Sequence, residues 1–185
     1  MPDAGLRAKR ATRSELRRIE AAVRHGLHLA AEAGRESPGL RDAVWELLLE
    51  AGDTLKRLPD RERGWLTAAT RAHWPDSLSG VGEVLIGGAP GGATAGTGPA
   101  RRPGPAGGEA IDRLDTVLPW LPLAAGRNRG REVAVLFGLA CGLRVAALRR
   151  FFGCGRSTVY DLRDRGLARI CGRLRAQSAF CRALP

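Results

Sequence analysis

Lysine is nearly missing from this 185-residue chain, although the chain is strongly basic. Lys9 and Lys56 are the only lysines, so 28 of the 30 basic residues are arginine. Codons rich in G and C produce such a preference without any functional cause. The preference for arginine therefore identifies no partner by itself.

Long hydrophobic runs and zinc-type cysteine spacings are also missing. The longest nearly apolar run, VAVLFGLACGL, is too short to span a bilayer. The N-terminal MPDAGLRAKR is charged and contains no apolar signal core. No two cysteines have the roughly two to four intervening residues of a zinc site. We therefore expect a soluble, cytoplasmic protein whose four cysteines are reduced and lie in the core: Cys141, Cys154, Cys171 and Cys181.

No group of residues has a recognisable catalytic or metal-binding spacing. His25 and His28 could share a helical face, but no neighbouring carboxylate or cysteine completes a metal site. The stretch GGAPGGATAGTG is rich in glycine but lacks the Gly-Lys-Ser/Thr of a phosphate-binding loop. Asp112 and Asp115 are typical of acidic residues near a helix N-terminus, where the helix dipole favours them. We therefore expect a protein that is not an enzyme and uses no cofactor or metal.

The positive charge is concentrated in the C-terminal part of the chain. Residues 1–100 hold 14 Lys/Arg and 13 Asp/Glu, whereas residues 101–185 hold 16 and 6. The two parts therefore carry net charges of +1 and +10 out of the total of +11. A codon preference does not explain this asymmetry. A concentrated basic field attracts polyanions, so nucleic acid is the partner that the charge favours.

The apolar spacing predicts an all-α protein. Apolar residues recur at three- and four-residue steps, as they do on one buried face of a helix. The expected helices cover residues 5–33, 40–58, 61–73, 109–118, 129–141, 143–152 and 156 to about 179. The first of these is amphipathic and basic, and is expected to be either a solvated helix or an arm that orders on a partner.

Glycine and proline divide the chain. Residues 80–108 contain 11 Gly and 4 Pro, too many to bury enough apolar area to offset the entropy lost on ordering. The expected organisation is a basic N-terminal extension (1–37), a helical segment (38–78), a flexible linker (79–108) and a helix-turn-helix DNA-binding domain (109–185).

The stretch FFGCGRSTVYDLRDRGLARI has the pattern of a helix-turn-helix motif. Leu148 and Phe152 are four residues apart and can share the inner face of the first helix. Gly153 can adopt the left-handed conformation that ends this helix. In the second helix, one inward stripe is expected, with Gly166 allowing a close approach to a neighbouring helix: Val159, Leu162, Gly166 and Ile170.

With that stripe buried, a polar and basic set is left for DNA. Arg156 could bind guanine through two hydrogen bonds, and Asp161 could accept one from the amino group of cytosine. Arg149 falls where such motifs usually have a small residue, so its side chain must extend outward. The candidate DNA-binding residues are Arg149, Arg150, Arg156, Ser157, Thr158, Tyr160, Asp161, Arg163 and Arg165.

Two resemblances accompany this pattern. Residues 129–176 resemble the fourth region of sigma factors, where a helix like REVAVLFGLACG precedes a turn and a start similar to FGCGRSTV. Residues 40–177 resemble an uncharacterised helix-turn-helix family of alphaproteobacteria and their phages or prophages. The shared elements are TLKRLP, the pair Trp74-Pro75, AIDRLD and the terminal motif. The resemblance implies DNA binding in a phage or regulatory context.

Two classes of function remain open at this point. A DNA-binding protein would act in transcriptional regulation, or in DNA packaging as a small terminase subunit does, with double-stranded DNA and a possible second copy as partners. The alternative is a helical adaptor that binds protein, RNA polymerase for example, through its tryptophans: Trp45, Trp65, Trp74 and Trp120. Tryptophans are more often core residues, which favours DNA binding.

Overall fold

The computed structural model describes residues 12–58, 104–126 and 130–185, and every regular element in these ranges is helical. The all-α prediction is therefore confirmed for this part of the chain. The elements are α1 (Arg13–Glu32), α2 (Leu40–Arg57), α5 (Gly108–Val117), the 3-10 helix η1 (Leu118–Ala124), α6 (Arg131–Ala140), α7 (Val145–Phe152), α8 (Arg156–Gln177) and α9 (Ala179–Ala183). The expected helix at 61–73 and most of the expected linker lie outside the described residues.

Helix α1 begins with a capping box that satisfies two otherwise unpaired backbone groups. The Glu15 N–H donates to Thr12 Oγ1 over 3.3 Å, and the Thr12 N–H donates to Glu15 Oε2 over 2.6 Å. Hydrogen bonding of the Glu15 carboxyl group to Thr12, to its backbone N–H foremost and then to its side chain, holds the pKa of Glu15 below its usual value. The start of α1 is thus fixed by its own sequence.

Helix α1 belongs to the core, and is neither a free arm nor a fully solvated helix. Ile19, Val23 and Ala30 are buried. Gly26 touches α2 so closely that a Cβ atom there would lie 2.5 Å from the Ala43 carbonyl oxygen. The expected boundary at residue 37 therefore does not separate α1 from the hydrophobic core.

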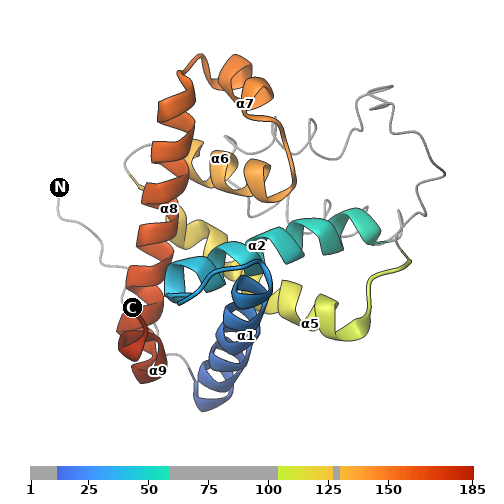
Figure 1. Ribbon diagram of the computed structural model, residues 1–185, viewed down its shortest axis with the longest axis vertical. Helices are drawn as coiled ribbons and strands as arrows, with labels where there is room; N and C mark the ends of the chain where they lie inside the picture. The colour runs from blue at the N-terminus through green and yellow to red at the C-terminus, as the bar shows by residue number, and fades with distance from the viewer. Residues whose placement is uncertain (1–11, 59–103, 127–129) are drawn as a thin grey trace, which may run out of the picture.

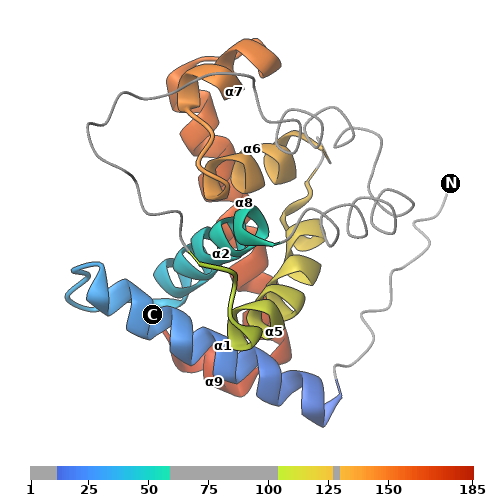
Figure 2. The ribbon, with the colours of Figure 1, turned by 90° about the vertical axis from the view of Figure 1, so that its right-hand side faces the viewer.

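The main hydrophobic core draws on α1, α2, α5, η1, α6, α8 and α9 (Figures 1 and 2). Its largest fully buried side chains include Leu40, Leu47, Leu136, Ile170 and Leu174. A second, smaller cluster lies where α7 packs on α6 and on the first turns of α8. Its buried members are Val135, Leu148, Val159 and Leu162.

Helix α8 is 22 residues long and connects the two clusters. Its C-terminal part lies in the main core, and its N-terminal part extends with α7 to one end of the molecule (Figure 1). The helix ends at Ser178, slightly before the expected end near residue 179. Ser178 is buried, and its hydroxyl donates to Glu20 Oε1 of α1 over 3.0 Å while accepting from the Cys181 N–H of α9 over 3.4 Å.

Among the described residues, no helix combines the length and the apolar character needed to cross a bilayer.

Candidate nucleic-acid interface

The corner between α7 and α8 has the geometry that the sequence predicts. Gly153 is left-handed, with φ 59° and ψ 39°, and ends α7. The N–H groups of Gly153 and Cys154 both donate to the Arg149 carbonyl oxygen, the latter over 3.2 Å. Cys154 is half-buried against the smaller cluster, so it fills the corner as expected. We call α7, this turn and the first three turns of α8 the α7–α8 tip.

The inward stripe of α8 is confirmed. Val159, Leu162 and Ile170 are buried, and Gly166 is buried as well. A Cβ atom on Gly166 would lie 3.4 Å from Leu136 Cδ2, which is an ordinary van der Waals distance. The expected close approach to a neighbouring helix is therefore not what requires glycine at this position.

The start of α8 is open to solvent. Its N-cap residue is Gly155, which provides no side-chain hydrogen bond to the first turn. Arg156 and Ser157 are exposed, and Thr158 is half-buried. The unpaired N–H groups of a helix N-terminus bind anions, and the helix dipole favours negative charge there. The tip thus presents a helix N-terminus beside an exposed guanidinium group.

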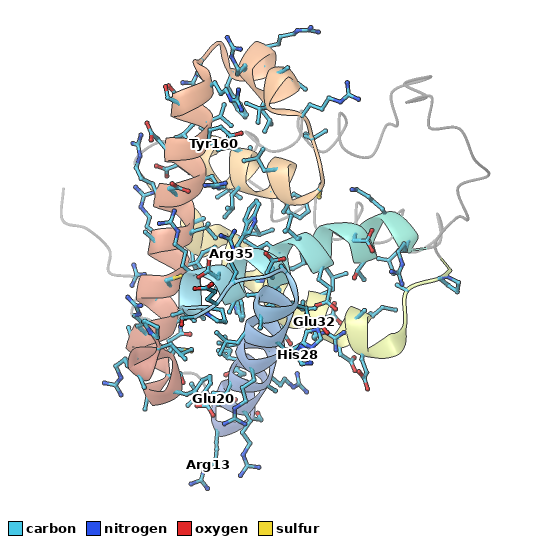
Figure 3. All side chains as sticks on the ribbon, viewed as in Figure 1. Arg13, Glu20, His28, Glu32, Arg35 and Tyr160 are labelled. Carbon is cyan, nitrogen blue, oxygen red and sulfur yellow. The ribbon has the colours of Figure 1, made fainter. Side chains whose placement is uncertain are left out.

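The candidate residues chosen from the sequence divide into two groups by burial. The exposed ones are Arg149, Arg150, Arg156, Ser157, Asp161 and Arg165. The half-buried ones are Thr158, Tyr160 and Arg163. Figure 3 shows Tyr160 on the part of α8 near α7. The exposed position of Arg149 agrees with the expectation that its side chain extends outward.

The tip is basic as far as Tyr160 because acidic residues are absent from a long stretch of the chain. Residues 133–160 contain four arginines and no Asp or Glu. All four, Arg144, Arg149, Arg150 and Arg156, are exposed. Within the described part of the chain, no carboxylate lies within 4.0 Å of their guanidinium groups. Arg144 was not among the predicted residues, although the acid-free stretch that contains it was visible in the sequence.

Arg163 differs from these arginines because it contacts two aromatic rings and forms an ion pair with a carboxylate of the protein. Its Cζ lies 5.2 Å from the centre of the Tyr160 ring and 5.5 Å from that of the Trp45 ring. Its Nε also lies 2.8 Å from Asp164 Oδ1, and Arg41 Nη2 lies 2.7 Å from the same oxygen. Partial burial raises the pKa of Asp164, but the hydrogen bonds from Arg163 and Arg41 lower it by a larger amount. The net pKa is therefore below the usual value. Asp164 therefore faces arginines of this chain.

Comparison of the chain with protein-family models, curated proteins and solved structures finds no match.

The geometry of the tip also includes an exposed aromatic ring. Phe151 adds to that geometry, because it is the one large apolar side chain that is exposed among the described residues, at 51%. Its ring packs edge-on against that of Phe152, with 4.8 Å between the ring centres. The tip therefore combines exposed arginines with one exposed aromatic ring.

The other polar clusters hold helices of the fold together. Glu132 is buried; its carboxylate accepts hydrogen bonds from Arg169 of α8 and, over 2.7 Å, from the Gly126 N–H. Arg113 of α5 binds Glu50 of α2 with Nη2 2.8 Å from Oε1, and this hydrogen bond raises its pKa. Both pairs join helices that are distant in sequence. Neither pair could be predicted from local spacing.

The histidines and cysteines form no metal site among the described residues. His25 is half-buried, with Nε2 3.4 Å from Glu50 Oε1, and His28 is exposed beside Glu32. All four cysteines are free thiols, and burial raises the pKa of Cys171 to about 11. A thiol with so high a pKa is a poor nucleophile near neutral pH.

Proposed function

We propose that this protein binds double-stranded DNA through the α7–α8 tip and catalyses no reaction. In this proposal the first turn of α8 enters the major groove, as the second helix of a helix-turn-helix motif does. The arginines of α7 and of the turn preceding it bind phosphates on either side of the groove.

The acid-free set of exposed arginines is the observation that carries the proposal. These arginines are close together in the chain: Arg144 precedes α7, Arg149 and Arg150 lie in its last turn, and Arg156 is the first residue of α8. Since none of them forms an ion pair with a carboxylate of the described residues, their positive fields add to one another. A partner that carries regularly spaced negative charge matches this arrangement.

The side chains of the first turns of α8 suit the reading of base edges. Arg156 is long enough to donate two parallel hydrogen bonds to O6 and N7 of guanine. Ser157 can donate to a base or a phosphate. Asp161 is exposed and carries no ion pair among the described residues, so it can accept from N4 of cytosine without losing a partner. Asp161 thereby disfavours bases that lack this donor.

A salt series on the full-length chain tests the proposal. The measurement is the fluorescence anisotropy of a labelled random-sequence duplex. Its logarithmic affinity is expected to fall linearly with the logarithm of salt concentration, with a slope of about −0.9 per phosphate contacted. The variant R144A/R149A/R150A/R156A is expected to flatten the slope by roughly 3 to 4 units.

A matched control removes equal charge from the other end of the molecule. Arg13, Arg17, Arg173 and Arg182 are exposed and lie on α1, the end of α8 and α9. The variant R13A/R17A/R173A/R182A is expected to keep most of the wild-type slope. Equal losses in the two variants would mean that DNA recognises net charge alone. A flat wild-type response would contradict DNA binding and favour the adaptor.

The tryptophans give the adaptor little support. Trp120 is buried and Trp45 is half-buried against the core, so neither presents an exposed ring. Trp65 and Trp74 lie outside the described residues. We therefore place the adaptor, with RNA polymerase as its possible partner, second to DNA binding.

The biological role within DNA binding is also a proposal. Transcriptional regulation requires a discrete operator sequence, whereas packaging of phage DNA requires an oligomer with modest sequence preference. Selection from randomised duplexes, together with the molar mass in solution, distinguishes these roles.

A further inference from the structure

Four side chains alternate between aromatic ring and guanidinium group from α2 to the start of α8. They follow the order Trp45, Arg163, Tyr160, Arg156. The Arg163 Cζ lies 5.5 Å from the Trp45 ring centre and 5.2 Å from the Tyr160 ring centre. The Arg156 Cζ lies 5.8 Å from the same Tyr160 ring. This row leads from a half-buried residue of α2 to an exposed residue of the tip.

A carboxylate holds the middle of this row in place. Arg163 Nη2 and Arg41 Nη2 lie 2.8 Å and 2.7 Å from the same oxygen of Asp164. Because its guanidinium group already has a carboxylate and two aromatic rings as partners, Arg163 would lose these contacts on binding a phosphate. Arg149 and Arg150 would lose no ion pair with the described residues.

We infer that Arg163 is a positioning residue and not a phosphate contact, and that Trp45 and Arg163 together orient Tyr160 and Arg156 for reading base edges. This inference rests on the proposed function. A planar guanidinium group stacks on aromatic rings on both of its faces, which an ammonium group cannot do. Helix α2 therefore sets the sequence preference of a site that it does not reach.

The substitution R163K distinguishes a positioning residue from a phosphate contact, because it keeps the positive charge and removes the planar guanidinium group. The substitution R165K is its matched control, since Arg165 is exposed on the same helix and contacts no aromatic ring among the described residues. Tyr160 is the only tyrosine in the chain, so its ring resonances in an NMR spectrum of the full-length protein need no further assignment. R163K and W45A are expected to shift these resonances, R165K to leave them unchanged, and W45F to restore most of the wild-type position.

Selection from a library of randomised duplexes gives the second measurement. R163K is expected to weaken the discrimination between preferred and random sequences by roughly five- to tenfold, which is the effect of misplacing one base contact. The dependence of DNA affinity on salt concentration is expected to stay unchanged, because the charge is kept. The inference is overturned if R163K matches the wild type in resonances and discrimination while R163A flattens the slope by about one unit. That result would make Arg163 a phosphate contact.

The two measurements also separate this inference from the proposed function. A wild-type chain that shows no salt-dependent binding contradicts DNA binding and the DNA part of the inference. Unshifted Tyr160 resonances in R163K and W45A contradict the positioning role alone, whatever the chain binds.

Discussion

Gly52 and Gly166 both lie inside helices, but only Gly52 has no room for a side chain. A Cβ atom on Gly52 would lie 2.5 Å from the Ala140 carbonyl oxygen, because α2 and α6 touch backbone to backbone there. On Gly166 the nearest atom would be a flexible leucine methyl group at 3.4 Å. The sequence alone does not distinguish these two glycines, because the space around each depends on the packing of neighbouring helices.

Substituting these glycines by alanine is expected to change stability in opposite directions. Gly166→Ala gains helix propensity and is expected to raise the free energy of unfolding by up to about 1 kcal/mol. Gly52→Ala forces α2 and α6 apart and is expected to lower it by about 1–3 kcal/mol. Urea unfolding measures both, with the open position Gly172→Ala as a control for propensity alone. A destabilised Gly166→Ala would mean that α8 and α6 approach more closely than the structure shows.

Ser178 is a second residue whose role depends on tertiary contacts. Its buried hydroxyl caps α9 and binds Glu20 of α1, so Ser178→Ala leaves one helix uncapped and one carboxylate without its donor. We expect a loss of about 1–2 kcal/mol in the free energy of unfolding. Ser178→Thr keeps the hydroxyl group and should lose less. Equal losses would indicate that space, and not the hydrogen bonds, matters at this position.

At the scale of elements, local sequence patterns predict where the helices lie, but they do not predict which helices contact one another. The bounds of α2, α5 and α7 lie within about two residues of the expected ones, because apolar periodicity and flanking Gly or Pro are local signals. Pro119 and Pro122 are residues that normally interrupt a helix, yet Leu118–Ala124 forms a 3-10 helix that buries Trp120. The pairing of Arg163 with Trp45 joins residues far apart in sequence, so no spacing rule could predict it.

The contact of α2 with α8 through Asp164 is expected to depend on pH. Because the folded-state pKa of Asp164 is lowered, its contribution to stability is present above its unfolded-state pKa and is lost as the pH falls through the lower folded-state value. The wild type should therefore be more stable than Asp164→Asn at pH 7, by at most about 1 kcal/mol for so exposed a pair. The difference should begin to shrink as the pH falls to about 4, the unfolded-state value, and vanish only below the lower folded-state pKa. Thermal unfolding at several pH values measures it, with Asp161→Asn as the control that breaks no ion pair among the described residues. A difference that persists at the lowest pH would exclude the ion pairs as its cause.

At the scale of the whole molecule, α8 runs from the basic tip into the main core, and α6 contributes to both hydrophobic clusters. The smaller cluster lies at the N-terminal end of α8, and α1 and α9 lie near its C-terminal end (Figures 1 and 2). The sequence suggested a separate extension before residue 38, since α1 is basic and its apolar stripe is incomplete. The structure shows why this pattern misled: small residues such as Ala22, Gly26 and Ala30 let α1 pack closely on α2 with few large apolar side chains.

Removing α1 is therefore expected to destabilise the whole molecule, including the tip that it does not touch. A chain that begins at residue 38 loses the burial of Ile19, Val23 and Ala30 and leaves the facing side of α2 in water. We expect the free energy of unfolding to fall by at least about 3 kcal/mol, from the apolar area exposed. A chain that begins at Thr12 keeps the capping box and should unfold at the wild-type urea concentration. If the chain from residue 38 is as stable as the wild type and binds DNA equally well, α1 is an independent extension, and α8 does not couple the tip to the main core.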